Sequence, residues 1–333
     1  MDRPRRRPGA LIAAAAACLA AAPTASPPPL RAMRWLAAGA DAAAVMTRRP
    51  LECLSAPADP DEAWRVEVGR AAFRDPLILG GQAARSGLTC ESCHTNGRTN
   101  PTFAFPGISG PPGTADVTNF LFTAHRGSRT GKPVPIPDLG GPKSRLKVSQ
   151  ARSSRALEDF VDGLMTQEFD GPPPPAAVVD ALAAYVRALG TGACPPGAGE
   201  SVRAGRGIED ARRAVRAASE AIARGEAATA VVMLQSARAA LGMLAERYPG
   251  PRLAADREGV IAADLDLAVL IAAVRATVAD APQRLSTWLA RSHDWAAPLL
   301  RDEPHSLYDR ATLAREEADR VDRNHEPREP HER

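Results

Sequence analysis

Residues 90–94 of this chain read Cys90-Glu91-Ser92-Cys93-His94. Two thiols three positions apart lie on one side of a helical turn, and a histidine follows at once. This C-x-x-C-H spacing is typical of c-type haem attachment. A zinc ribbon would need a second ligand pair, and the sequence has no other C-x-x-C and no H-x-x-x-H. We therefore predict one covalent haem c on Cys90 and Cys93, with His94 as the proximal iron ligand.

Residues 1–27 have the pattern of a secretory signal peptide. An arginine-rich start precedes an alanine-rich apolar run over 11–22, and small residues follow. The run is too short for a convincing membrane span, so we expect no integral span in the mature form. The prediction is export to a bacterial periplasm. Cys18 lies inside the run, and lipid anchoring there is a less favoured alternative.

The charge of the chain does not indicate nucleic acid as a partner. The formal net charge is +3, and the predicted signal peptide carries four arginines and Asp2. Its removal leaves a mature protein close to neutral. A basic face for nucleic acid is therefore not expected.

The composition favours helices. Aromatic residues make up only 4% of the chain and alanine is abundant, which suits helices packed through small side chains. Proline and glycine concentrate between Pro101 and Pro175, so long loops are expected there. After Cys194-Pro195-Pro196-Gly197, helical periodicity runs over 201–323 and predicts three to five antiparallel helices. Pro282 and Pro298 are expected to divide the last part.

Several helical patterns surround the C-x-x-C-H motif. Asp61–Phe73 reads as an amphipathic helix that starts at Pro60. A second helix is expected over Val178–Leu189, with Gly190 as its C-terminal cap. Weaker signals predict a helix near Leu157–Met165, a weak helix within 28–50 and a turn at Gly80-Gly81.

The first and last of these helices are expected to cross. Small c-type cytochromes pack an N-terminal helix across a C-terminal one. Gly69 and Phe73 on the first helix, and Tyr185 on the second, suit that contact. Glycine permits a close approach and the aromatic rings fill the space beside it.

A haem iron takes a fifth ligand and often a sixth, which sets its reactivity. Met165 lies on the apolar face of a helix downstream of His94, and we predict it as the distal iron ligand. The neighbouring Gly163 leaves room for a ring. The alternatives are a core methionine at Met165, or ligation by Met233, Met243 or His125.

Three further residues are predicted to support the haem. Arg98 and Arg126 could neutralise its propionates through bidentate hydrogen bonds. One of the prolines after the motif, with Pro106 as the first choice, could present a carbonyl to the His94 ring and fix its tautomer.

Cysteine usage agrees with export. With Cys18 removed and Cys90 and Cys93 used for haem, Cys53 and Cys194 remain as a pair that flanks the haem region. In an oxidising compartment a disulfide between them is predicted. The alternative is two independent buried thiols.

Longer motifs extend the C-x-x-C-H signal: Gly69-Arg70-Ala71-Ala72-Phe73, Asp75-Pro76-Leu77, Gly87-Leu88-Thr89 before Cys90, and Leu157-Glu158-Asp159-Phe160-Val161 before Met165. With the helix over 179–190, they resemble the cytochrome c domain of the di-haem cytochrome c peroxidase family. The resemblance implies that Met165 corresponds to the sixth ligand of that family's electron-transferring haem. Family members carry two such domains, whereas this chain has one C-x-x-C-H.

The predicted fold is all-α. A cytochrome c-like haem domain with long loops spans 28–198, a helical bundle domain spans 199–323, and a disordered tail spans 324–333. The favoured function is electron transfer by an exported mono-haem cytochrome with a redox partner protein. The alternatives are a haem peroxidase or oxidase, with His125 or a glutamate as acid/base, and a haem-based sensor or binding module. No catalytic residue is assigned.

Overall fold

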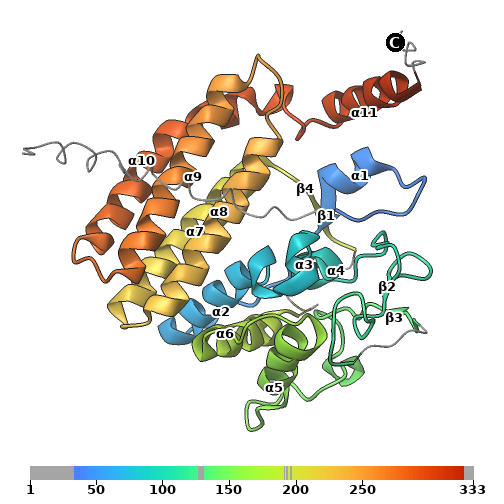
Figure 1. Cartoon of the computed structure of the whole chain (residues 1–333), viewed down its shortest axis with the longest axis vertical. Helices are drawn as coiled ribbons and strands as arrows, with labels where there is room; N and C mark the ends of the chain where they lie inside the picture. The colour runs from blue at the N-terminus through green and yellow to red at the C-terminus, as the bar shows by residue number, and fades with distance from the viewer. Residues whose placement is uncertain (1–33, 127–130, 191, 193, 196, 326–333) are drawn as a thin grey trace, which may run out of the picture.

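The computed structural model describes residues 34–126, 131–190, 192, 194–195 and 197–325. The predicted signal peptide, Cys18 and residues 326–333 lie outside this part. The fold is mostly helical, with 58% helix and 5% strand, and long helices form a bundle in the C-terminal half. Figure 1 shows this bundle above a loop-rich N-terminal half.

The helical crossing predicted for the N-terminal half is present. Helix α2 (Pro60–Ala72) is capped by Asp59, whose carboxylate accepts from the Glu62 N–H, and it packs across α6 (Ala176–Ala188). A Cβ on Gly69 would overlap the backbone carbonyl of Ala181. The rings of Phe73 and Tyr185 meet beside this point with centroids 5.1 Å apart. Glycine is therefore required for the backbones to approach so closely.

The end of α6 differs from the prediction. Gly190 does not cap the helix, because the preceding Leu189 is already extended and forms a β-bridge with Leu54. The Gly190 N–H then donates to the Cys53 carbonyl at 2.9 Å. The chain therefore leaves α6 through strand-like pairing instead of a left-handed glycine turn.

The remaining elements of the N-terminal half are short. They are α1 (Ala42–Thr47), β1 (Arg48–Pro50), α3 (Gly81–Arg85), α4 (Cys90–Cys93), β2 (Thr114–Ala115), β3 (Val134–Pro135) and α5 (Ala156–Gly163), with 3-10 turns at Pro76–Ile78, Thr95–Gly97 and Lys143–Arg145. The expected weak helix over 28–50 is thus only six residues long in the described part, and it runs into β1. A π-helical segment, Leu164–Glu168, continues α5. The long loops predicted between 101 and 175 are present.

The bundle consists of α7 (Ala204–Ala223), α8 (Ala227–Glu246), α9 (Ala254–Arg275) and α10 (Ala281–Asp302). Pro282 starts α10 as predicted, but Pro298 lies inside that helix and does not end it. Leu299 and Ala296, on either side of Pro298, are fully buried. This packing holds the last turn of α10 despite the hydrogen bond that proline removes.

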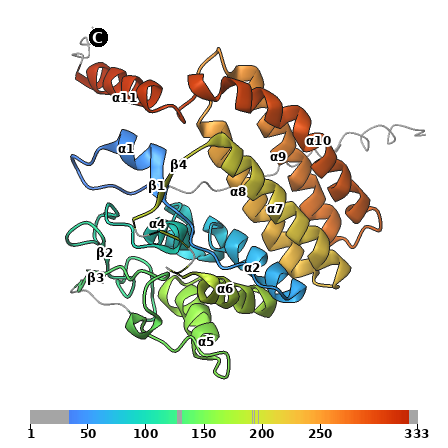
Figure 2. The ribbon, with the colours of Figure 1, turned by 180° about the vertical axis from the view of Figure 1, so that it is seen from behind.

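Two segments extend beyond the bundle. A 3-10 turn, Glu303–His305, leads to α11 (Arg310–His325), which packs near α1 and pairs Arg310 with Asp41 at 3.0 Å. Helix α11 reaches His325. Residues 324 and 325, which the sequence assigned to a disordered tail, are therefore helical. Figure 2 shows α11 projecting away from the bundle beside α1.

The two halves share one core. Strand β4 (Gly199–Ser201) returns beside β1 in antiparallel register, with Arg48 opposite Ser201. Helix α2 contacts α7 and α8, and one cluster of buried apolar side chains extends from Val66 to Leu299. The predicted boundary at 198/199 therefore falls where the chain pairs back onto the N-terminal half.

Glu52 ties the halves together electrostatically. Its carboxylate accepts from Arg70 and Arg74 on the chain around α2, from the Tyr185 hydroxyl at 2.9 Å and from Arg206 of α7. Burial alone would raise the pKa of Glu52, but Arg74, Arg70 and Arg206 outweigh it and hold that pKa well below its usual range. The buried carboxylate is therefore charged and fully paired.

Helix α8 is the described helix long and apolar enough to cross a membrane by length and composition. It lies between α7 and α9, and 56% of its most apolar window is buried inside the protein. A core helix of a bundle has these properties too.

Candidate haem-binding site

The C-x-x-C-H motif forms helix α4, a single turn. Thr89 and Ser92 close it with a capping box, in which the Ser92 N–H donates to the Thr89 hydroxyl at 3.1 Å and the Thr89 N–H donates to Ser92 Oγ at 3.0 Å. The His94 N–H donates to the Cys90 carbonyl at 2.9 Å. These bonds fix the two cysteines and the histidine relative to one another.

Cys90 and Cys93 are free thiols, half-buried against the apolar core. Burial raises the pKa of each to about 12, so both are neutral at neutral pH. Among the described residues, no group of three or more histidine, cysteine, aspartate or glutamate side chains could hold a metal ion. The two thiols are thus available for covalent attachment, and a protein-only zinc site is not formed around them.

The His94 ring is oriented by a backbone carbonyl. Its Nδ1 lies 3.0 Å from the Pro137 oxygen, which can only accept, so Nδ1 carries the proton and Nε2 is left as the ligating nitrogen. Burial lowers the pKa of His94 to about 4, against the opposing effects of Pro137 and Asp138. The imidazole is therefore neutral at neutral pH. The prediction that a proline after the motif presents this carbonyl is confirmed. The residue is Pro137 and not Pro106, because the loop after β3 returns to the motif.

That loop is fixed to the motif by its backbone. The Leu139 N–H donates to the Gly97 carbonyl at 3.0 Å, and Gly97 has a positive φ of 74°. Asn96, also in the left-handed region at φ 51°, donates from its side-chain amide to the Pro50 carbonyl at 2.8 Å. The turn after His94 is thus held from two sides.

Two of the four predicted candidates, Met165 and His125, lie in the N-terminal half. Met165 is the more buried of these two, with 1% of its surface exposed. It lies in the π-helical segment, a local irregularity that is frequent at functional sites. Its carbonyl accepts from the Gly171 N–H at 2.8 Å. Gly171 packs closely against the backbone of Leu79 and Gly80. A Cβ on Gly80 would overlap the Gly171 Cα, and a Cβ on Gly171 would overlap the Leu79 carbonyl oxygen.

The other three candidates lie elsewhere. Met233 is fully buried inside α8, and Met243 is partly buried on the same helix of the bundle. His125 has 65% of its side chain exposed and pairs its Nδ1 with Asp170 at 2.7 Å. This arrangement favours Met165 over the alternatives.

Arg98 and Arg126 already have carboxylate partners. The Arg98 guanidinium binds both oxygens of Asp138 at 2.8 and 2.9 Å, and Arg126 pairs with Glu168 at 3.0 Å. Asp138 directly follows Pro137, so the Arg98 pair helps to hold the loop that orients His94. Both predicted propionate partners thus pair with carboxylates of the chain, and propionate binding by them stays a prediction.

A row of aromatic rings was not predicted. The ring centroids of Trp35 and Phe105 are 4.4 Å apart, those of Phe105 and Phe122 are 5.3 Å apart, and those of Phe122 and Phe169 are 5.6 Å apart. The rings of each pair are inclined to one another. All seven phenylalanines of the chain lie between 73 and 169. This uneven distribution is the signal that could have identified the row. A porphyrin is a large apolar plane, and an aromatic wall in the loops beside the motif suits it.

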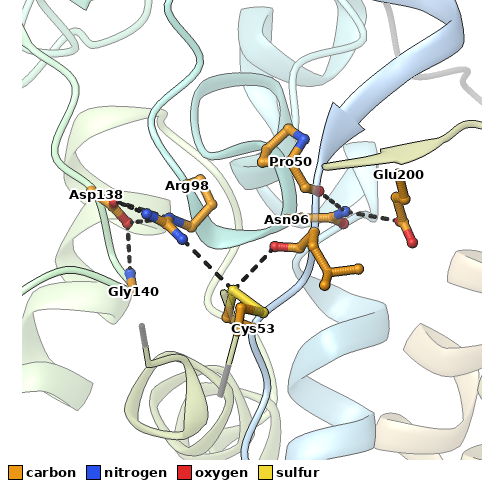
Figure 3. Close-up of a disulfide and its surroundings, with 9 residues drawn as sticks. Pro50, Cys53, Asn96, Arg98, Asp138, Gly140 and Glu200 are labelled. Atoms are coloured by element: carbon orange, nitrogen blue, oxygen red, sulfur yellow. Dashed lines mark hydrogen bonds and ion pairs between the residues drawn. A yellow bond between two sulfur atoms is a disulfide. The ribbon is translucent and has the colours of Figure 1, made fainter. Parts of the chain in front are cut away.

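Cys53 and Cys194 are joined by a disulfide across 141 residues. Figure 3 shows Cys53 beside Asn96 and Arg98, which follow His94 in the chain. Arg98 Nη1 lies 3.7 Å from the Cys53 sulfur, and Arg98 also pairs with Asp138. The bond closes the chain around the segment that contains α4, the loops and α6.

The residues present fit a covalent haem: two free thiols on one turn, a neutral histidine with one nitrogen already hydrogen-bonded, and a buried methionine. They define a helical protein with a C-x-x-C-H site. Comparison with known proteins adds no family to this description, since no family model, curated protein or solved structure matches the chain.

Proposed function

We propose that this chain is an exported mono-haem c-type cytochrome that transfers electrons. Cys90 and Cys93 would hold the haem covalently, with His94 and Met165 as the iron ligands. The haem would supply a one-electron couple between ferric and ferrous iron. The observation that carries the proposal is the hydrogen bond from His94 Nδ1 to Pro137, which leaves a neutral Nε2 on a C-x-x-C-H turn with two free thiols.

The chain's own residues favour a closed site. Met165 is buried, and the side chain predicted as a possible acid/base, His125, is exposed and paired with Asp170. Two protein ligands leave no open position for a substrate, which suits electron transfer better than peroxide chemistry. The likeness to the cytochrome c domain of the di-haem peroxidases supports the same assignment.

Visible spectra of the oxidised and reduced protein test this proposal. His/Met haems show a weak far-red charge-transfer band, which we expect in the wild type and not in Met165→Ala. Met243→Ala is the matched control, because it truncates a methionine of the bundle, and it should keep the band. A high-spin ferric wild type that reacts rapidly with peroxide would contradict electron transfer and support the peroxidase alternative.

A further inference from the structure

A cavity of about 150 Å³ lies between helix α4 and the bundle. Thr89, Glu91 and Ser92 line it from the motif side, whereas neither Cys90 nor Cys93 does. The cavity therefore faces the side of α4 that the two thiols do not use. Its size matches a ligand about as large as benzene.

Arginines dominate the polar part of its wall. Four of them form ion pairs: Arg49 with Glu200 at 2.7 Å, Arg74 with Glu52 at 2.9 Å, Arg203 with Glu303 at 3.1 Å, and Arg206 with Glu52. Among the residues the structure describes, no carboxylate forms an ion pair with the remaining two, Arg34 and Arg247. Two carboxylates also line the cavity: Glu91 pairs with Arg74 at 3.5 Å, and Asp210 pairs with Arg206 at 3.5 Å. The six guanidiniums of the wall are thus matched by these two carboxylates and by three outside the wall, those of Glu52, Glu200 and Glu303.

Of the two arginines without an ion pair, Arg247 is buried, with 6% of its surface exposed, and Arg34 is partly buried. Burial lowers the pKa of Arg34; Glu91 opposes this, and the neighbouring charges of Arg247, Arg49 and Arg74 add to it. Burial also lowers the pKa of Arg247, against the opposing effects of Tyr308 and Glu246. A buried guanidinium without an ion pair is costly, so an anion in the cavity would stabilise Arg247.

The wall is also pre-organised. Arg247 donates to the carbonyls of Leu307 at 2.8 Å and Met46 at 3.0 Å, and it lies over the Tyr308 ring. These contacts fix its guanidinium without neutralising it. The Nη2 of Arg49 is buried and has no hydrogen-bond partner in the structure. A donor of this kind is left for a ligand.

We propose that this cavity binds a small oxyanion, such as inorganic phosphate or a short carboxylate. Planar guanidiniums match the oxygens of both groups, often with two parallel hydrogen bonds. The wall formed by α7 and α8 includes the small side chains of Ala214, Ala239 and Ala240, beside Asp210, Ser236 and Met243. This wall limits the size of the ligand. The bound anion would join α4 to the bundle and neutralise Arg34 and Arg247.

Calorimetric titration and thermal melting of the protein as isolated test the site, in a buffer free of phosphate and sulfate. Inorganic phosphate should raise the melting temperature more than sodium chloride of equal ionic strength. Propionate is the second probe. Tighter binding of phosphate assigns the site to phosphate groups, and tighter binding of propionate assigns it to carboxylates.

The variant Arg34→Gln should weaken binding of the preferred probe at least tenfold. In phosphate-free buffer it should melt close to the wild type, because Arg34 is partly exposed and forms no ion pair with a carboxylate among the described residues. Arg216→Gln is the matched control: it removes an exposed arginine from α7, outside the cavity wall, and should bind as the wild type does. Arg34→Lys keeps the charge and should retain part of the affinity.

Two results would overturn the proposal. One is that neither probe raises the melting temperature beyond the chloride control. The other is that Arg34→Gln binds the probe as tightly as the wild type, and that Arg247→Gln does so too where it folds. Probe binding and melting temperature are measured without the haem spectrum. A negative result would therefore overturn the anion site and leave the proposed electron transfer unaffected.

Discussion

The loop-rich half over 34–190 and the bundle over 204–302 reach a packed state by different means. The bundle uses four long helices in contact through alanines, such as Ala211, Ala214 and Ala218 of α7, each at most 2% exposed. The loop-rich half has short elements, positive-φ turns and side-chain hydrogen bonds to backbone, and it contains all seven phenylalanines. A long irregular stretch in a compact fold needs an organising element. Regular helix packing organises the bundle, and we propose that the haem organises the loop-rich half.

The largest expected effect comes from removing both attachment thiols. In Cys90→Ala/Cys93→Ala we expect no covalent haem, and faster hydrogen exchange over the loops between 95 and 175, while α7–α10 keep their protection. Hydrogen exchange read by mass spectrometry measures both halves at once. Ser286→Ala/Thr287→Ala, two exposed positions on α10, is the control and should change neither half. An equal loss of protection in both halves would remove the distinction between them.

The second effect is a pH dependence at the joint between the halves. Asp75 is buried, accepts from the Leu77 N–H at 2.9 Å and approaches Ser236 of α8 at 3.4 Å. Burial raises its pKa from 3.8 to about 7, against the hydrogen bonds from Leu77 and Ser236. The unfolded chain ionises first, so the stability due to Asp75 is fully present below about pH 4. It is lost as the pH rises to about 7, by about 4 kcal/mol at most.

Asp75→Asn tests this dependence, because the amide oxygen can still accept from Leu77 and the side chain cannot ionise. Chemical denaturation at pH 5 and pH 8 should show a smaller difference in the free energy of unfolding for the variant than for the wild type. The variant should also be the more stable protein at pH 8. An unchanged pH profile would show that Asp75 does not titrate in this range.

The third effect concerns the disulfide. Cys53→Ser/Cys194→Ser should lose about 2–4 kcal/mol of stability, because the bond closes a long loop in the unfolded chain. Exchange should rise around β1 and the end of α6 and not in α9 or α10. Mapping of alkylated peptides checks the starting point: alkylation of Cys53 and Cys194 without prior reduction would exclude the bond.

The smallest effect concerns a single methyl group. Gly69→Ala places a Cβ against the Ala181 carbonyl and should cost about 1–3 kcal/mol by overpacking the crossing of α2 and α6. Gly163→Ala is the matched control, since nothing lies within 4 Å of a Cβ there, and it should be neutral or stabilise α5 by about 0.5–1 kcal/mol. Urea denaturation of both variants compares them directly. Equal free energies of unfolding for the two variants would mean that α2 and α6 can move apart to accommodate the added methyl group.

Sequence periodicity predicted the helices well wherever packing is regular. The bounds of α2 and α6 and the succession α7–α10 follow from apolar spacing, and the close approach at Gly69 follows from one glycine beside two aromatic residues. Pro298 was misread because local propensity does not include the burial of Leu299. Gly190 was misread because its cap depends on Leu54 and Cys53, more than 130 residues away.

The sequence identifies the residues of the candidate site, but it does not identify the contacts that hold them in place. The cysteines, His94 and Met165 follow from spacing and apolar pattern. The carbonyl that orients His94 comes from Pro137, 43 residues downstream, and no local signal distinguishes it from Pro106. Arg98 and Arg126 carry the charge expected for propionate binding. The sequence does not reveal that they form ion pairs with Asp138 and Glu168 in the folded chain.

We propose that one haem is held covalently by the α4 turn and organises the loop-rich half. Intact-mass spectrometry under denaturing conditions detects the covalent bond. We expect a mass greater than that of the polypeptide alone by one haem, and no such increase in Cys90→Ala/Cys93→Ala. A bare polypeptide mass in the wild type, expressed where c-type cytochromes mature, would contradict it.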